Sequence, residues 1–249
     1  MNGTDLEQAL LARYPGRLAA EWDHIGFLVG NRAEEITGIV VSLDVTPEAV
    51  ALAKASGANL ILSHHPVIFG GLNTVTEDSL VWKLIRNGLS VISMHTNLDA
   101  AAGGVNDVLC DVIGLTDTVG LSPVADGFEI RMGLLPSALN AADFAAVLKE
   151  KLHGTVSYTP GSTPLRRIAV CSGSGSDFLA LAKENGADAL VTADVKHHVY
   201  GEARRTGIAL FDCGHFETED VIVEPLAQTL RELTGLPVLT CHESGIRRI

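Results

Sequence analysis

The sequence predicts an α/β protein built from two related α/β domains, each with a mainly parallel sheet that carries helices on its faces. The composition is 47% hydrophobic but only 5% aromatic, with 25 glycines, which is typical of domains built from Ala, Val, Leu and Ile. Short apolar runs alternate with helical stretches along the chain, and one such unit occurs twice. At 249 residues the chain is long enough for two domains of about 125 residues, each with its own core.

The repeated unit is a helical stretch followed by a strand. The segment LAKASGANLILS, at 52–63, is echoed by LAKENGADALVT, at 181–192, and the shared residues coincide at a constant offset of 129 positions. A β-type run precedes each copy and another follows it: ITGIVVSLD (36–44) and GLSVISMH (88–95) in the first half, LRRIAVCSG (165–173) and GIALFDCGH (207–215) in the second. Each half is therefore predicted to run strand, helix, strand, connection, strand, helix.

A second echo follows the last strand of each half. HTNLD (95–99) and HFETE (215–219) both place a carboxylate four residues after a histidine, at a constant offset of 120 positions. The helical stretches that come next close with Gly-Leu at 114–115 and at 235–236, as helix C-termini do. The domains are therefore predicted as residues 1–124 and 125–249, with the changeover near Ser122-Pro123-Val124.

The net charge, the first residues and the cysteine spacing limit which classes of protein the sequence can belong to. A net charge of -12 argues against a nucleic-acid partner, because phosphate backbones are bound by clustered Lys and Arg. The first residues, MNGTDLEQALLARYPG, are acidic where a signal peptide is basic, and no apolar run approaches the ~20 residues that cross a bilayer. The four cysteines show no C-x-x-C spacing, which predicts reduced thiols. We therefore expect a cytoplasmic protein with no membrane partner.

Histidines and acids gather where predicted strands end. LILSHHPVIF, at 60–69, ends a buried strand in two adjacent histidines before a proline. Neighbouring residues inside a strand point to opposite faces, but beyond its end both imidazoles can serve one site. The residues that fall just after predicted strands are His64, His65, His95, Asp99, His215 and Glu219. Open α/β sheets bind ligands in the crevice beyond the carboxyl ends of their strands.

These residue types point to a metal site. Imidazole and carboxylate suit divalent Zn, Mn, Fe, Co or Ni, and a pair of ions about 3.5 to 4 Å apart needs a bridging carboxylate besides terminal ligands. A single histidine is more often a packing or capping residue, but three histidine-bearing strand ends favour metal. We predict two divalent ions in the cleft between the domains, with Asp99 as the bridge; the predicted ligands are His64, His65, Asp99, His215 and Glu219.

Six motifs resemble, in order and across nearly the whole chain, those of the Nif-three-like family, whose members are often labelled GTP cyclohydrolase type 2 homologues. The motifs are EWDHIGFLVG, SLDVTPEAV, LILSHHPVIF, SMHTNLD, DVKHH and GHFETE. The resemblance implies two metal ions held by the same five residues, two α/β domains, and a ring-like homohexamer assembled from dimers. His24 departs from the family, which usually has asparagine in a W-D-N pattern.

The remaining histidines are assigned as follows. His24 is expected on the surface or behind the ligands. His95 is expected to orient Asp99 or to approach the metals. His198 matches a family position near the centre, and we predict it as a catalytic residue that transfers a proton or holds substrate. His197 fits the surface of a helix as well as it fits the site.

The sequence allows two roles each for one loop and for one cysteine. CSGSGSD (171–177) connects a strand to a helix, where backbone N–H groups can bind an anion. The alternative is a tight turn with Asp177 as a cap. Cys213 lies two residues before His215 and is expected to be a buried thiol or, less often, to touch the site.

Two functions follow from this inventory. In the first, a two-metal centre activates water for attack on a heterocyclic C=N bond, an amide or a phosphoester, with Asp99 bridging the ions and His198 moving protons. The ligand would be phosphorylated or nucleotide-like. In the second, the same side chains capture and carry metal without catalysis, or the ring presents a surface to partners. Turnover by the metal-loaded protein distinguishes them.

Overall fold

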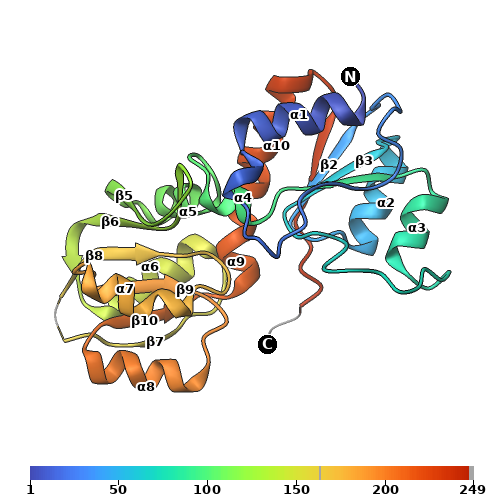
Figure 1. Cartoon of the computed structure of the whole chain (residues 1–249). Helices are drawn as coiled ribbons and strands as arrows, with labels where there is room; N and C mark the ends of the chain where they lie inside the picture. Colours follow the sequence, from blue (N-terminus) through green and yellow to red (C-terminus); the bar gives the residue numbers. More distant parts are fainter. Residues whose placement is uncertain (163, 247–249) are drawn as a thin grey trace. The chain divides into compact units, whose positions relative to one another are not determined.

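The computed structural model describes residues 1–162 and 164–246. The chain divides into two units: Met1–Ala101 together with Val223–Ile249 form the first, and Ala102–Ile222 form the second. Each unit is built around one sheet (Figure 1). The predicted α/β class with two sheets and helices is therefore confirmed.

The first unit contains a five-stranded sheet with the strand order β1-β4-β3-β2-β11. Four strands are parallel, and β1 is antiparallel at one edge. Every residue of β2, β3 and β4 is buried, as expected for parallel strands with helices on both faces. The strands are β1 (Gly26–Val29), β2 (Ile39–Ser42), β3 (Leu60–Ser63), β4 (Ser90–Ser93) and β11 (Val238–Cys241). The helices are α1 (Gly3–Arg13), η1 (Gly16–Leu18), α2 (Pro47–Ser56), α3 (Leu80–Arg86), α4 (Thr96–Ala100) and α10 (Val223–Thr234).

Local sequence signals fix the first crossover of this unit. Thr46 caps α2 because its side chain accepts a hydrogen bond from the Ala49 N–H at 3.1 Å. Pro47 occupies the first turn, where no N–H is needed. Gly57 ends the helix in the left-handed conformation, with a φ of 75°. The short loop after β2 therefore keeps Asp44 at the carboxyl edge of the sheet.

The second unit contains a six-stranded sheet with the strand order β5-β6-β8-β9-β10-β7. Only β8, β9 and β10 are parallel. The strands are β5 (Thr116–Val124), β6 (Gly127–Leu139), β7 (Ser157–Thr159), β8 (Leu165–Val170), β9 (Ala189–Thr192) and β10 (Ala209–Asp212). The helices are α5 (Val105–Ile113), α6 (Ala141–Leu152), η2 (Ser176–Phe178), α7 (Leu179–Glu184), α8 (His197–Thr206), α9 (His215–Glu219) and η3 (Asp220–Ile222).

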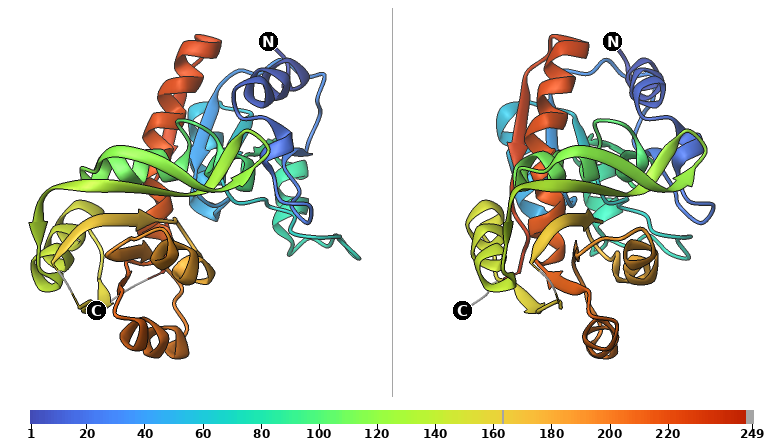
Figure 2. Two further views of the ribbon diagram at one scale, coloured as in Figure 1. Left: turned by 60° about the vertical axis from the view of Figure 1, so that its left-hand side comes forward. Right: turned by 90° about the vertical axis from the view of Figure 1, so that its left-hand side faces the viewer.

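This second sheet corrects one prediction, since it is mixed and not mainly parallel. β5 and β6 form a hairpin across two residues, and such a short connection joins antiparallel neighbours only. Figure 2 shows this hairpin as a long twisted ribbon. β7 adds a further antiparallel pair with β10. The three central strands bury alternate side chains on opposite faces: Ile168 and Val170 pack in one core cluster and Ala169 in another.

The predicted repeat is present in both units. The first runs β2-α2-β3-α3-β4-α4 and the second runs β8-α7-β9-α8-β10-α9. In both, the three strands are parallel neighbours in chain order. The two echoed histidines, His95 and His215, stand at the start of the short helices α4 and α9.

The division of the chain differs from the predicted boundary near Ser122-Pro123-Val124, which lies inside β5. The reason is that the helix and strand that follow each repeat belong to the other unit. α5 and β5, which follow the first repeat, belong to the second unit, and β5 pairs with β6. α10 and β11, which follow the second repeat, belong to the first unit, and β11 extends its sheet beside β2.

Candidate metal centre

The two adjacent histidines lie just past the end of β3, as predicted. The His64 N–H donates to the Ser42 carbonyl at 3.1 Å and the His65 N–H donates to the Leu43 carbonyl at 2.9 Å. Consecutive N–H groups of a regular strand point to opposite sides, so the backbone has left the strand geometry here. The two imidazoles consequently lie side by side, with ring centroids 5.1 Å apart.

Buried hydroxyls stabilise this turn. Ser63 and Ser93 are fully buried at the ends of β3 and β4, and their Oγ atoms lie 2.8 Å apart. The Ser63 hydroxyl donates to the carbonyl of His65 at 2.7 Å. The backbone that carries the imidazoles is therefore fixed from below by the sheet.

Each histidine of the first unit's cluster has its Nδ1 atom bound to an oxygen. His64 Nδ1 lies 2.9 Å from the Met94 carbonyl, and His65 Nδ1 lies 2.8 Å from Asp44 Oδ1. His95 Nδ1 lies 2.9 Å from Asp23 Oδ1. A carbonyl or carboxylate only accepts, so Nδ1 carries the proton and the lone pair of a neutral ring lies on Nε2. This is how metal-ligating histidines are normally oriented.

The three imidazoles converge. One ring nitrogen of each of His64, His65 and His95 lies within 4.8 Å of the others. Asp99 joins them, since its Oδ1 lies 3.5 Å from His64 Nε2. We call His64, His65, His95 and Asp99 the first set. It contains His95, which the sequence analysis expected only to orient Asp99 or to approach the metals.

A buried acid holds His95 in place. The Asp23 side chain is fully buried, and it accepts hydrogen bonds from the Thr96 N–H at 3.1 Å and the Thr96 hydroxyl at 2.5 Å besides His95. Burial raises the pKa of Asp23, but the hydrogen bonds from His95 and Thr96 outweigh it and bring the pKa to about 2. Asp23 is therefore a permanent carboxylate that fixes both His95 and the first turn of α4.

The second unit repeats the pairing of histidine and acid. His215 and Glu219 are four residues apart on α9, and His215 Nε2 lies 3.0 Å from Glu219 Oε2. His215 Nδ1 lies 2.6 Å from Asp194 Oδ2, so this imidazole too has its Nδ1 held by an acid. We call His215 and Glu219 the second set. The side chain of Glu219 is only 6% exposed, so its charge needs a partner.

His215 is a strong base in this arrangement. Its hydrogen bond to Glu219 raises the pKa, burial opposes this, and the bond to Asp194 adds to the rise, which brings the pKa to about 9. Without metal, the proton on His215 Nε2 therefore balances the charge of Glu219, as a bound cation would.

Gly173 allows the loop after β8 to approach the second set. Its φ is +56°, and its N–H donates to Thr218 Oγ1 at 3.0 Å. A Cβ atom at this position would overlap Glu219 Oε1 and lie 3.2 Å from His215 Nε2. The glycine thus keeps space open around the two ligand atoms.

The hydrogen bonds of the loop after β8 favour a tight turn over an anion-binding site. The N–H groups of Ser172, Gly173 and Gly175 donate to Asn106, Thr218 and Thr192 respectively, at 2.8 to 3.0 Å. These amides are used within the protein, and the helix α7 that follows has only six residues. No side-chain cap precedes η2, so Asp177, expected as the cap in the turn alternative, lies in its first turn instead.

The other candidate residues are not members of either set. His24 is exposed. His197 and His198 are exposed in the first turn of α8, and within the described residues the clustered ligand atoms do not include them. Cys213 is fully buried in the core, and burial raises the pKa of its thiol far above the usual range. The role of His198 as a catalytic residue stays a prediction.

Three acids that orient imidazoles were not predicted from the sequence: Asp23, Asp44 and Asp194. Each lies inside one of the six motifs of the family resemblance: Asp23 in EWDHIGFLVG, Asp44 in SLDVTPEAV and Asp194 in DVKHH. A usable signal existed, since a metal-bound histidine needs an acceptor for its second nitrogen and acids near strand ends are the available acceptors.

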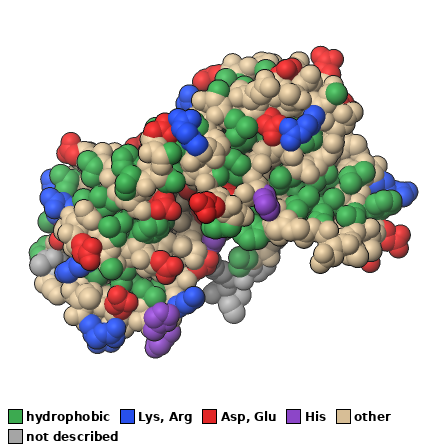
Figure 3. All heavy atoms as spheres, in the orientation of Figure 1, with side chains coloured by type: hydrophobic (Ala, Val, Ile, Leu, Met, Phe, Trp, Pro, Cys, Tyr) green, Lys and Arg blue, Asp and Glu red, His purple; other side chains and the backbone are tan. Residues whose placement is uncertain are grey.

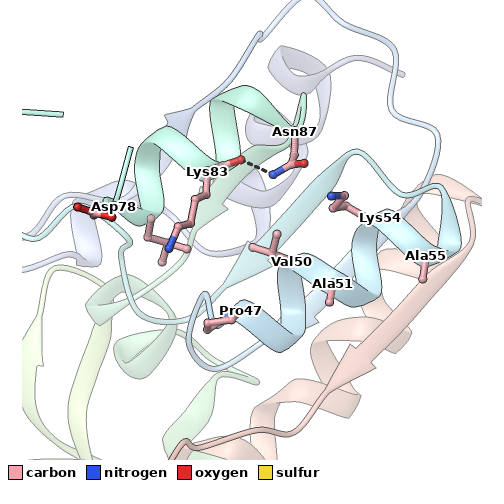
Figure 4. A pocket seen from close by; sticks show the side chains of 9 residues that line it. Pro47, Val50, Ala51, Lys54, Ala55, Asp78, Lys83 and Asn87 are labelled. Carbon is pink, nitrogen blue, oxygen red and sulfur yellow. Dashed lines mark hydrogen bonds between the residues drawn. The ribbon is translucent and has the colours of Figure 1, made fainter. Parts of the chain in front are cut away.

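A groove elsewhere in the first unit carries different chemistry. It lies between α2 and α3, has a volume of about 710 Å³ and is lined mainly by small and apolar side chains (Figure 4). Its charged lining residues are Lys54, Lys83 and Asp78, and no histidine contributes. The groove is therefore not a second candidate for the metal centre.

One face of the described residues shows how the charged side chains are distributed (Figure 3). On the face of the described residues drawn in Figure 3, Lys and Arg side chains stand at separate positions among Asp and Glu. No helix in the described parts of the chain is both long and apolar enough to cross a membrane.

Comparison with known proteins now places the chain. The sequence pattern of the Duf34/NIF3 (NGG1p interacting factor 3) family matches residues 1–244. The chain belongs to this family. Two relatives, each named GTP cyclohydrolase 1 type 2 homolog, share about a third of their residues with it. The one from Clostridium perfringens is 33% identical over 227 residues, which cover 88% of this chain and 87% of the relative. The one from Lactococcus lactis is 34% identical over 228 residues, which cover 87% and 86%.

Solved structures of the family show the same fold. A hypothetical protein of Staphylococcus aureus is 30% identical with a TM-score of 0.92, and the match covers 100% of this chain and 99% of the other. A Bacillus cereus protein related to NIF3 has a TM-score of 0.91 at 22% identity, with coverage of 100% and 99%, which supports the fold alone. The predicted resemblance to the Nif-three-like family is confirmed.

Proposed function

We propose that this NIF3-family chain binds two divalent metal ions and uses them for hydrolysis. The proposed ligands are those predicted from the sequence: His64, His65, Asp99, His215 and Glu219. Asp99 is proposed to bridge the ions. His95 is added here as a further imidazole at the first set, because a ring nitrogen of His95 lies within 4.8 Å of one on His64 and one on His65.

The observation that carries this proposal is the common orientation of four histidines. In each, Nδ1 is held by a carboxylate or a backbone carbonyl, which leaves Nε2 as the ligand atom. Three of these rings lie together on the first unit, and the fourth lies against Glu219 on the second. Histidines that serve only packing have no need of a shared ring orientation. The mixed nitrogen and oxygen donors fit Zn, Mn, Fe, Co or Ni.

Such ions supply a water of lowered pKa and a Lewis acid. The chain's own part is to fix the ligand rings through Asp23, Asp44 and Asp194, and to keep room at Glu219 through Gly173. We propose that His198 moves a proton during the reaction. The proposed substrate is nucleotide-like, a cyclic amidine or a phosphoester, in line with the cyclohydrolase-like name of the relatives.

The proposal extends to assembly and place of action. We propose a ring-like homohexamer built from dimers, acting in the cytoplasm, with a small phosphorylated or nucleotide-like ligand and without nucleic acid. All four cysteines lie in the described part of the chain as free thiols, which supports a reducing compartment. The net charge of -12 supports the absence of a nucleic-acid partner.

Turnover tests the enzyme directly. The purified chain, loaded with Zn²⁺ or Mn²⁺, is screened against nucleotides, cyclic amidines and phosphoesters, with Asp99→Asn as the variant and the exposed His153→Asn as the matched control. We expect activity that is lost in Asp99→Asn and kept in the control. Bound metal that is quickly lost to a chelator, without any turnover, would instead support a metal carrier.

A further inference from the structure

Two exposed aromatic side chains stand together on the first unit. The chain has only two Trp, three Tyr and seven Phe. Trp22 is nevertheless 59% exposed and Phe69 is 69% exposed, and their ring centroids lie 5.6 Å apart. Large aromatic side chains that remain this exposed in a contacting pair mark a binding surface more often than single exposed residues do.

Both rings lie against a member of the first set. The centroid of Trp22 is 6.0 Å from that of His95, with the planes at 71°. The centroid of Phe69 is 6.3 Å from that of His95, with the planes at 70°. These are edge-to-face contacts, so the two aromatic rings border the imidazole cluster. A group resting on them lies next to the proposed metal ligands.

Trp22 is exposed but not loosely held. The neighbouring Asp23 is buried and bound to His95 and Thr96. The Ala20 N–H donates to the Thr96 hydroxyl oxygen at 2.9 Å. The residues on both sides of Trp22 in the chain are thus bound to the start of α4. An aromatic ring carried on such a fixed turn binds at a lower ordering cost than one on a free loop.

We propose that Trp22 and Phe69 form a stacking platform that selects substrates with a flat heteroaromatic ring, such as a nucleobase. This rests on the proposed function, because the platform would hold the ring beside the metal ligands. Aromatic faces stack on any flat π system, which gives affinity for the class of ring and leaves the reacting group free to differ. The platform also gives a role to the Trp22–Gly26 loop.

Fluorescence offers a direct test. Trp82, the second tryptophan, lies on α3 and is 39% exposed, so Trp82→Phe leaves Trp22 as the sole tryptophan. The zinc-loaded variant is titrated with GMP, CMP and nicotinamide mononucleotide, and with ribose 5-phosphate as the matched probe that lacks a ring. We expect at least one ring-bearing probe to quench Trp22 and ribose 5-phosphate to leave it unchanged.

Equilibrium dialysis with the same probes tests each residue. We expect Trp22→Ala and Phe69→Ala to weaken binding of the ring probe by about 10- to 100-fold, Trp22→Phe to restore part of it, and Trp82→Ala to have no effect. Bound zinc, measured by elemental analysis, should stay at the wild-type level in all of them.

Three results would overturn the platform. They are the absence of binding by every ring-bearing probe to zinc-loaded protein, equal binding of ribose 5-phosphate, and unchanged binding in Trp22→Ala and Phe69→Ala. Each leaves the metal measurement intact and so is distinct from failure of the proposed function, in which the wild-type chain retains no zinc.

Discussion

The two units share a backbone plan but use its equivalent positions differently. Both have a short helix with a histidine and an acid four residues apart, His95 and Asp99 in one, His215 and Glu219 in the other. After the middle strand of each repeat, β3 or β9, the first unit has His64 and His65, whereas the second has Ala193 and Asp194 at the offset of 129 positions.

This difference shows how one frame supports two roles. In the first unit the strand end carries the proposed ligands His64 and His65, and the acid that orients His95 is Asp23, which precedes β1. In the second unit the strand end itself supplies the orienting acid, since Asp194 binds Nδ1 of His215. A helix that places histidine and acid on one face needs only one orienting acceptor, and that acceptor can come from different segments.

Loss of a ligand should have the largest effect. We expect His64→Ala to reduce the bound metal by at least half, because three imidazoles of the first set become two, and Glu219→Ala to reduce it less, with the fold kept in both. Elemental analysis and circular dichroism check this. His153→Asn is the control, and metal content equal to wild type in both variants would remove these residues from the ligand set.

The orienting acids should come next. Asp44→Asn and Asp194→Asn keep the size of the side chain but no longer present a charged acceptor to Nδ1, so we expect each to lower metal affinity by about 10- to 100-fold. Competition with a metal-binding dye measures the affinity. Equal affinities in wild type and both variants would show that the rings do not depend on these acids.

The third prediction concerns the stability of the second unit at Gly173. Gly173→Ala should lower the free energy of unfolding by about 2 kcal/mol or more, because the positive φ is strained and the Cβ meets Glu219. Gly57→Ala is the matched control, since its φ is also positive but nothing lies within 4 Å of its Cβ, and about 1 kcal/mol is expected there. Denaturant unfolding measures both, and equal losses would mean that the space at Glu219 is not restricted.

The smallest expected effect is the pH dependence of metal binding. His215 has a pKa of about 9 without metal, so below pH 9 the ring is protonated and a metal must displace that proton. Metal affinity should therefore rise with pH up to about 9, and binding at pH 7 should release a proton. Titration in weak buffer measures the release, and its loss in His215→Ala assigns it. A pH-independent affinity would contradict the assignment.

Much of this molecule could be predicted from the sequence because it repeats. The matching segments at 52–63 and 181–192 indicated the strand and helix order, and predominantly apolar strands such as Leu60–Ser63 indicated parallel central strands. The exchange of α5–β5 and α10–β11 could not be predicted, because each helix ends with the same Gly-Leu signal whichever sheet its strand joins.

Part of the candidate site could be predicted from the sequence and part could not. Histidines at strand ends are recognisable from spacing, and His64, His65 and Asp99 do lie together on the first unit. The orienting acid Asp23 lies 72 positions from its imidazole, a separation at which only the folded sheet brings them together. The approach of His95 to His64 and His65 likewise appears only in the folded structure.

The most direct test is crystallography with anomalous scattering at the zinc and manganese edges on crystals soaked in each ion. We predict metal peaks about 2.0 to 2.2 Å from the proposed ligand atoms, with each histidine Nδ1 still bound to its oxygen. The proposed ligand atoms are Nε2 of His64, His65, His95 and His215 and the carboxylate oxygens of Asp99 and Glu219. Metal peaks only at other positions, or none at full soaking, would contradict the metal centre on which this account depends.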